Sequence, residues 1–231
     1  SFDICVSTGA AMPTLSLVWA ATRGMNVAYV ESLTRTSGPS MAGKIVSLHP
    51  GIAVRTQHPG WKGRRWRYEG SVLDSVGVAA ADAPKGPLKV LVTLGTIRPY
   101  RFDRLIRAVE AILDTSDSVT WQVGSTAVQN LPGRVVTEMT EPELRAEMAG
   151  ADVVVTHAGV GSILLAHSVG KVPVIAPRSA AFKEHVDDHQ SSFSASIRER
   201  HLALTLPLDG TASRSTLIDA ASKRVISPVS I

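Results

Sequence analysis

The chain of 231 residues has a single cysteine, and aromatic residues make up only 5% of it. One cysteine cannot build a disulfide framework within a chain, so Cys5, which lies in an apolar run, is expected to pack in a core in a reducing compartment. No stretch approaches the ~20 consecutive apolar residues of a membrane-spanning helix. The sequence also contains no solenoid-type repeat and no low-complexity tract. These absences leave an ordinary globular chain.

The residues that are present have the balance of such a chain, with 44% hydrophobic residues and 24 basic against 20 acidic residues, a formal net charge of +4. The length is sufficient for one large domain or two small ones with a real core. Nucleic-acid binding requires basic residues gathered on one face, and this sequence has one short basic cluster. We therefore expect no nucleic-acid partner.

The most informative pattern lies between residues 151 and 190. A short β-branched run at 153–155 has the length of a buried strand, and an apolar helix is predicted from 162 to 169. A second buried strand is predicted at 172–176, just before Arg178. This order of strand, glycine loop, helix and strand indicates a βαβ unit, which binds ligands where its strands end and its helix begins.

The loop between this strand and helix suits a phosphate group. Gly159 and Gly161 lack a Cβ, so the backbone can approach a ligand closely. The free N–H groups and positive dipole end of the following helix attract anions, and Ser162 adds a hydroxyl in the first turn. The G-x-G-S spacing is neither a P-loop nor a complete dinucleotide fingerprint. Glycines that only permit tight strand-to-helix packing are therefore the alternative.

A polar cluster, E-H-V-D-D-H-Q, follows the second strand at 184–190 and is expected to share a crevice with the glycine loop. His185 and His189 are four residues apart on one predicted helical face, so a metal site that includes Asp188 is one interpretation. A solvated helix start is another. The spacing defines no third ligand, and hydrogen bonds to a nucleotide-sugar use the same groups, so we expect no metal.

Three motifs in this region carry a family resemblance: H-A-G-V-G-S at 157–162, G-K-V-P-V-I-A-P-R at 170–178, and the cluster at 184–190. Together they resemble the donor-binding half of family 28 glycosyltransferases, most of all the bacterial exopolysaccharide and capsule transferases. The dolichol-pathway and peptidoglycan N-acetylglucosaminyltransferases are more distantly similar. The resemblance covers Leu88 to the C-terminus. It implies an α/β fold of two Rossmann-like, doubly wound halves facing a cleft, as in the GT-B architecture.

The same resemblance implies the reaction: transfer of a sugar, with inversion, from a UDP-sugar to a polyprenyl-diphosphate-linked sugar, in the synthesis of a cell-surface polysaccharide. The departing diphosphate is stabilised by helix-end N–H groups, so neither a metal nor another cofactor is expected. A nucleotide-sugar epimerase of the same fold and a non-catalytic nucleotide-sugar-binding subunit are the alternatives. The sequence does not identify the donor sugar, the acceptor, the linkage or the oligomeric state.

Residues from four segments are expected to bind the donor. They are Gly95, Thr96, His157, Ala158, Gly159, Val160, Gly161, Ser162, Arg178, His185, Asp187, Asp188, His189 and Gln190. The glycine loop, Gly95–Thr96 and Arg178 are assigned to the diphosphate, and the motif resemblance assigns 187–190 to sugar and nucleotide hydroxyls. Family members often carry an acidic residue for the ribose on the helix after the loop. This chain has Leu164-Leu165-Ala166 there, so another group binds the ribose or the donor preference differs.

The front of the chain repeats the strand–helix–strand order, with strands predicted at 2–7 and 27–30 around a helix at 13–23. Its motifs V-S-T-G-A, Y-V-E-S-L-T-R and S-M-A-G-K resemble the partner subunit of the capsule transferases. That subunit supplies membrane association and much of the acceptor side. We interpret the chain as a fusion of the two subunits, at work in the cytoplasm and peripheral at the inner face of the cell membrane.

The chain opens inside a predicted strand and without an initiator methionine, so we expect the front half to be incomplete. The family's glycine-rich loop with a histidine, a candidate catalytic base, would then precede Ser1. Glu31 and His157 remain as the candidate bases. Glu31, Ser32 and Arg35, which follow a predicted strand, are assigned to the acceptor side.

The segment from Trp61 to Tyr68 interleaves basic and aromatic residues, in the sequence W-K-G-R-R-W-R-Y. This pattern suits an anionic membrane surface or a diphosphate-linked acceptor. A loop with partly buried tryptophans and solvated arginines is an equal alternative, and RNA stacking a weaker one. Linker composition places the domain boundaries at 1–80 for the front half, 81–87 for the linker and 88–231 for the donor half.

Overall fold

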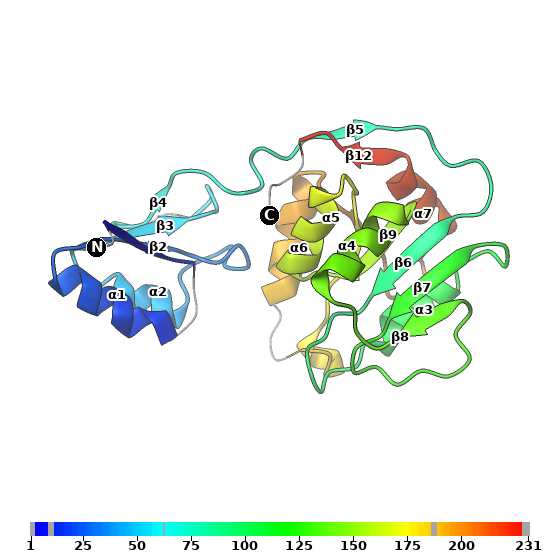
Figure 1. Ribbon diagram of the computed structural model, residues 1–231, viewed down its shortest axis with the longest axis horizontal. Coiled ribbons are helices and arrows are strands. Elements are labelled where there is room, and N and C mark those ends of the chain that lie inside the picture. The colour runs from blue at the N-terminus through cyan, green and yellow to red at the C-terminus, as the bar shows by residue number, and fades with distance from the viewer. Residues whose placement is uncertain (1–2, 9–11, 62, 186–188, 228–231) are drawn as a thin grey trace. The chain divides into compact units, whose positions relative to one another are not determined.

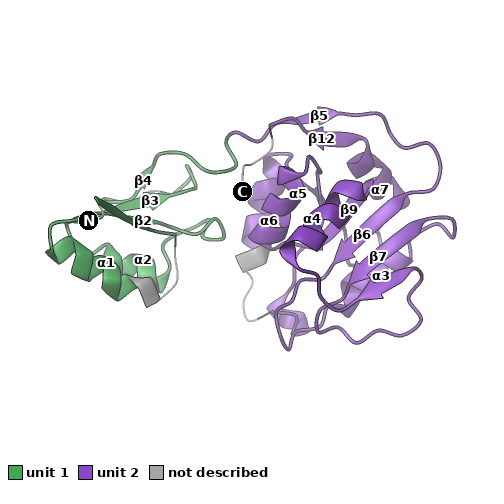
Figure 2. Cartoon of the chain, in the orientation of Figure 1, with its two compact units in different colours: residues 1–74 green, residues 75–231 purple. Residues whose placement is uncertain are grey.

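The computed structural model describes residues 3–8, 12–61, 63–185 and 189–227, with the backbone alone at 12–13 and 189–190. The chain divides into two compact units, Ser1–Asp74 and Ser75–Ile231 (Figure 2). This division lies before the linker that we placed at 81–87. The reason is β5 (Val78–Ala80), which pairs antiparallel with β12 (Lys223–Val225) and so belongs to the second unit.

The first unit is a parallel four-stranded sheet with helices against one face (Figure 1). Its elements are β1 (Ile4–Ser7), α1 (Met12–Thr22), β2 (Asn26–Val30), α2 (Met41–Val46), β3 (Ile52–Thr56) and β4 (Arg67–Tyr68). The strands lie in chain order, and right-handed crossovers between parallel strands in that order place α1 and α2 on the same face. Leu17, Tyr29 and Ile52 are buried between the sheet and these helices.

The second unit contains a six-stranded parallel sheet in the order β11-β10-β9-β6-β7-β8. Its strands are β6 (Lys89–Thr93), β7 (Ser118–Gln122), β8 (Arg134–Val136), β9 (Val153–His157), β10 (Val174–Ala176) and β11 (Leu204–Thr205). Its helices are α3 (Asp103–Glu110), α4 (Glu141–Gly150), α5 (Val160–Ser168), the 3-10 turn η1 (Ala180–Phe182), α6 (His189–Glu199) and α7 (Arg214–Ala221). The strand order runs outward in both directions from β6 and β9, so the topological switch point lies between these two strands.

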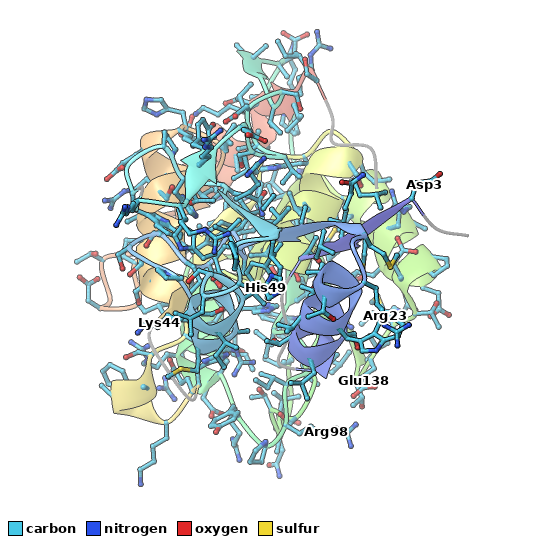
Figure 3. All side chains as sticks on the ribbon, turned by 90° about the vertical axis from the view of Figure 1, so that its left-hand side faces the viewer. Asp3, Arg23, Lys44, His49, Arg98 and Glu138 are labelled. Carbon is cyan, nitrogen blue, oxygen red and sulfur yellow. The ribbon has the colours of Figure 1, made fainter. Side chains whose placement is uncertain are left out.

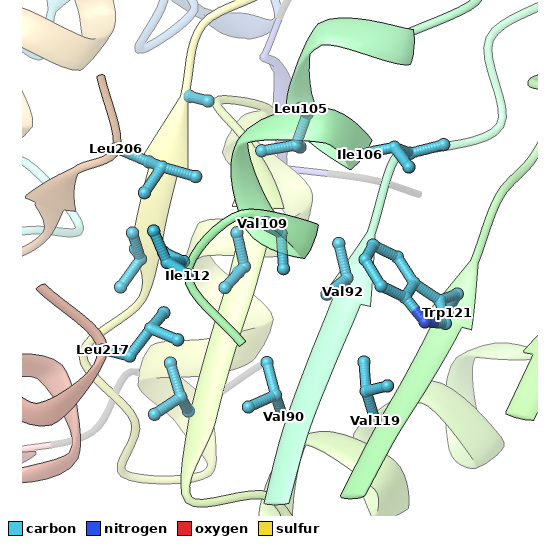
Figure 4. Close-up of a cluster of buried hydrophobic side chains, with 14 of the residues drawn as sticks. Val90, Val92, Leu105, Ile106, Val109, Ile112, Val119, Trp121, Leu206 and Leu217 are labelled. Atoms are coloured by element: carbon cyan, nitrogen blue, oxygen red, sulfur yellow. The ribbon is translucent and has the colours of Figure 1, made fainter. Parts of the chain in front are cut away.

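The central strand β6 is buried on both faces, which explains why its sequence is a continuous apolar run rather than an alternating one. Val90 and Val92 point into a core with Val109 of α3 and Leu217 of α7 (Figure 4). Leu91 points to the other face. Each such side chain contributes roughly 1.5–3 kcal/mol by its burial.

The opposite core of the second unit contains Met148 of α4 and Leu165 of α5, packed with Leu91. Helices therefore cover both faces of the sheet, as a doubly wound fold requires. Within the described ranges, no helix is both long enough and apolar enough to cross a membrane.

Candidate functional site

The switch point of the second unit carries a cavity of about 440 Å³. β6 and β9 are parallel neighbours with Thr93 beside Thr156, so the loops that follow them emerge side by side. The lining residues are Thr93, Gly95, Thr96, Ile97, Gln122, Met139, Glu141, Leu144, His157, Gly159, Gly161, Ser162 and His185. Among the predicted donor residues, the cavity brings together Gly95, Thr96, His157, Gly159, Gly161, Ser162 and His185.

The start of α5 presents unsatisfied backbone donors at this cavity. Gly159 is the N-cap residue, and no side chain caps it (φ −78°, ψ 134°). The first intrahelical bond is donated by the N–H of Ile163 to the Gly159 carbonyl, at 3.1 Å. The N–H groups of Val160, Gly161 and Ser162 precede it and have no acceptor within the helix. Such a helix end binds an anion.

The glycines of the site have different tasks. A Cβ on Gly95 would lie 2.6 Å from Cε1 of His157, and one on Gly159 would lie 2.4 Å from its Nε2. Both glycines therefore make room for the His157 ring. A Cβ on Gly161 would meet nothing within 4 Å. Gly161 thus leaves the helix end open, whereas the packing alternative holds for Gly95 and Gly159. Ala158 is fully buried and does not line the cavity.

His157 is held as a neutral imidazole. Burial lowers its pKa to about 4, the positive charge of Arg178 acts in the same direction, and a hydrogen bond with the Thr93 backbone opposes both. A group with this pKa is a weak proton acceptor at neutral pH, since an effective general base has a pKa near the working pH. The environment of His157 therefore favours a structural or hydrogen-bonding role over the catalytic base that the sequence suggested.

Glu31, the other candidate base, is 1% exposed in the first unit. Its carboxylate accepts hydrogen bonds from the N–H groups of Ser32 (3.0 Å) and Ser40 (2.7 Å) and from the Tyr29 hydroxyl (3.3 Å). These bonds fasten the loop between β2 and α2, so the carboxylate is occupied and enclosed. The assignment of Glu31 to catalysis and to the acceptor side stays a prediction.

The neighbouring acceptor-side residues also make local contacts. The Ser32 hydroxyl lies 3.1 Å from that of Thr34. The carbonyl of Arg35 accepts a hydrogen bond from Nε1 of Trp61, at 2.8 Å. Both residues are half-buried, and they shape the loop after β2.

Arg178, predicted to bind the diphosphate, is 1% exposed. Its Nη2 donates to the Leu94 carbonyl (2.5 Å), and its Nη1 donates to the carbonyls of Tyr100 (3.1 Å) and Glu184 (2.9 Å). Its guanidinium lies 4.9 Å from the centre of the Phe102 ring. Arg178 therefore ties together the loops around the cavity, and its assignment to the diphosphate stays a prediction.

The polar cluster at 184–190 is only partly described. Glu184 is 4% exposed, and His185 lines the cavity and stacks on Tyr100, with ring centroids 6.2 Å apart. Asp187 and Asp188 lie outside the described residues. His189 and Gln190 form the first residues of α6 and are described by their backbone alone. Their assignment to the sugar remains a prediction.

Several lining residues were not predicted from the sequence. Gln122 ends β7 and accepts a hydrogen bond from Thr93, at 2.5 Å. Met139, Glu141 and Leu144 come from the connection between β8 and α4 and from its first turn. Gln122 is the last residue of β7, and the other three follow β8, the edge strand of the sheet. All four lie at the carboxyl ends of strands, where open α/β sheets bind ligands.

Part of the basic and aromatic segment of the first unit is packed. Trp66 is 7% exposed and lies edge-on to Tyr29, and Trp61 lies 5.2 Å from Trp66 between ring centroids. Arg65 donates to the carbonyls that follow α2, including Ile52 at 2.6 Å. For these residues the partly buried loop describes the structure better than a membrane surface, while Arg64 is exposed.

The chain is similar to known proteins in sequence and in fold. The profile of the glycosyltransferase family 28 C-terminal domain matches residues 89–205, just over half of the chain. The chain belongs to glycosyltransferase family 28. It is 28% identical over 188 residues to the UDP-N-acetylglucosamine–N-acetylmuramyl-(pentapeptide) pyrophosphoryl-undecaprenol N-acetylglucosamine transferase of Aromatoleum aromaticum, covering 71% of this chain and 50% of that protein. The transferase of the same name from Ralstonia nicotianae is 25% identical over 179 residues, covering 72% and 47%. The chain thus spans about half the length of these relatives.

Solved structures show the same fold. The glycotransferase of kitacinnamycin superposes with a TM-score of 0.60 at 17% identity, covering 95% of this chain and 67% of that one. MurG of Acinetobacter baumannii superposes with a TM-score of 0.59 at 15% identity, covering 94% and 63%. These likenesses confirm the predicted α/β class with a GT-B-type fold.

Proposed function

We propose that this chain is the donor-binding part, with a portion of the acceptor side, of an inverting glycosyltransferase that uses a UDP-sugar. The observation that carries the proposal is the uncapped start of α5, which opens onto the cavity at the switch point beside Gly95 and Thr96. Backbone N–H groups placed there stabilise the negative charge that develops on a departing diphosphate. They need no metal for this, so donor binding is expected to be indifferent to EDTA.

The acceptor in the proposal is a sugar linked to a polyprenyl diphosphate. Support comes from the relatives named above, whose names specify a pyrophosphoryl-undecaprenol acceptor. The motif resemblance to exopolysaccharide and capsule transferases supports synthesis of a cell-surface polysaccharide. A lipid-linked acceptor requires the protein to work at a membrane surface, and we place that work at the inner face of the cell membrane.

Calorimetric titration of UDP and several UDP-sugars into the chain tests the donor site. Micromolar UDP binding that EDTA does not change supports it. Absence of UDP binding by the folded chain contradicts it. UDP-sugar binding followed by release of free epimer without any acceptor would favour the epimerase alternative instead. Binding without turnover in the longest available protein would favour a non-catalytic subunit.

The first unit offers a surface for the membrane contact other than the packed residues Trp61, Arg65 and Trp66. α1 carries Leu15 (79% exposed) and Trp19 (57%), and the neighbouring α2 region carries Met41 (70%) and Leu48 (82%). Figure 3 labels Arg23, which directly follows α1, and Lys44, which belongs to α2. The Arg23 guanidinium lies 4.7 Å from the centre of the Trp19 ring. Exposed apolar side chains with basic neighbours bind anionic bilayers.

Exchanging Leu15 and Leu48 together for glutamine is expected to weaken binding to phosphatidylglycerol vesicles about tenfold, because each leucine loses part of its transfer free energy of roughly 1.5–3 kcal/mol. Vesicle co-sedimentation measures the change. Ile218→Gln, at a 44% exposed position on α7, is the matched control and should bind like the wild type. If the double variant also binds like the wild type, this surface is not the membrane contact.

A further inference from the structure

We propose that Arg104 and Glu184 are positioning residues for the sugar end of the donor site. Their ion pair holds the segment 179–185 against α3 and thereby sets where His185 stands at the cavity. The identity of the ligand in this inference rests on the proposed function. The anchoring of the segment 179–185 is a property of the ligand-free protein.

The ion pair has the geometry of a strong one. Arg104 donates from Nε to Oε1 of Glu184 at 2.8 Å and from Nη2 to Oε2 at 2.7 Å. The side chains are 20% and 5% exposed. The Arg104 guanidinium also lies 3.7 Å from the centre of the Phe182 ring. Arg104 therefore contacts the segment at two side chains, and a planar guanidinium fixes orientation as well as distance.

The segment itself closes into a tight loop between Ser179 and Glu184. The Ser179 N–H donates to Oε2 of Glu184 at 3.1 Å, and the Glu184 N–H donates to the Ser179 carbonyl at 3.1 Å. Lys183 adopts a left-handed backbone conformation (φ 57°) to complete the turn. The Glu184 carboxylate thus links the start of the loop, at Ser179, to its end and also to Arg104 of α3.

The same loop is joined to the opposite wall of the cavity. Arg178 bridges the carbonyl of Glu184 to those of Leu94 and Tyr100, which flank Gly95 and Thr96. His185 stacks on Tyr100 at the cavity. A displacement of Glu184 therefore moves His185 relative to the phosphate end of the site. Side chains misplaced by about 1 Å can cost roughly 100-fold in function.

Arg104→Ala leaves the Glu184 carboxylate enclosed without its main partner, a state that proteins relieve by local rearrangement. We expect the variant to bind a UDP-sugar at least about tenfold more weakly while its affinity for UDP changes less than threefold, because the glycine loop stays intact. Calorimetry with UDP, UDP-glucose and UDP-N-acetylglucosamine measures the affinity of each protein for UDP and for the two UDP-sugars. Arg104→Lys keeps the charge but loses the two parallel hydrogen bonds. Its affinity for a UDP-sugar should therefore lie between those of Arg104→Ala and the wild type.

The matched control is Arg107→Ala, an exposed arginine on the same helix, which should leave both affinities unchanged. Equal affinities for wild type and Arg104→Ala would overturn the proposal. So would an equal loss of UDP and UDP-sugar together with a lower melting temperature, because that result describes a general structural role.

Hydrogen exchange on the ligand-free protein separates this proposal from the proposed function. Arg104→Ala should accelerate exchange of the Ser179 and Glu184 amides at least about tenfold, with the β6 and β9 amides unchanged. If the wild type fails to bind UDP and yet shows this pattern, the donor assignment fails and the anchoring stands. If exchange in 179–185 is unchanged, the anchoring fails whatever the ligand.

Discussion

Gly161→Trp is expected to raise the dissociation constant for UDP at least about 100-fold, a loss of roughly 3 kcal/mol, without lowering the melting temperature. A Cβ at this position meets nothing within 4 Å, so the indole extends into the cavity rather than into the core. There it occupies the space in front of the α5 N–H groups, which are proposed to receive the diphosphate. Calorimetry and thermal unfolding on the same sample measure both effects.

Gly150→Trp is the matched control, because a Cβ at Gly150 also meets nothing within 4 Å and Gly150 does not line the cavity at the switch point. It should bind UDP like the wild type. Gly159→Ala is a poor substitute for the test, since its Cβ would lie 2.4 Å from Nε2 of His157 and would disturb the fold. Undiminished UDP binding by Gly161→Trp would show that the phosphates do not lie at the start of α5.

The second large effect concerns pH. The free energy of unfolding should fall by roughly 2–3 kcal/mol between pH 7.5 and pH 4.5 through His157 alone. In the unfolded chain its imidazole takes up a proton near pH 6.5, whereas burial lowers the folded pKa to about 4. The unfolded state therefore binds more protons in this interval. The stabilisation is complete above pH 6.5 and is lost as the pH falls toward 4.

Burial lowers the pKa of His167 as well, so that residue adds a loss of the same sign. Urea unfolding at several pH values measures the slope of the free energy of unfolding against pH. The difference in this slope between wild type and His157→Gln isolates the contribution of His157 from those of the carboxylates. Identical slopes for wild type and His157→Gln would show that this ring takes up its proton in the folded protein as readily as in the unfolded chain.

The second unit was largely predictable, because buried parallel strands and amphipathic helices have strong sequence patterns. The strand predicted at 153–155 is β9, and the helix predicted from 162 to 169 is α5, which begins two residues earlier. In the first unit, β3 and the short helix α2 were not predicted. α2 has only six residues, and β3 contains Arg55, so neither presents a long periodic pattern.

Two predicted site residues make contacts that the sequence does not reveal, for one physical reason. Glu31 and Arg178 stand at the ends of strands, where charged residues commonly face ligands, and each proved to be buried with backbone partners. A sequence shows that a charge is present but not which carbonyl or N–H group reaches it first. The Arg104–Glu184 pair was missed for the same reason, since its partners are eighty residues apart.

The short pairing of β5 with β12 has a consequence for modularity. Besides the pairing itself, the N–H of Ile226 donates to the Gly77 carbonyl at 3.0 Å, and the N–H of Ala81 donates to the Ser222 carbonyl at 2.8 Å. The carboxyl-terminal strand thus depends on residues that the sequence would allot to the front half. A gene split at the apparent linker of 81–87 would leave half of this ribbon on each polypeptide. A donor half able to travel between proteins as a self-contained module has to begin ahead of Gly77.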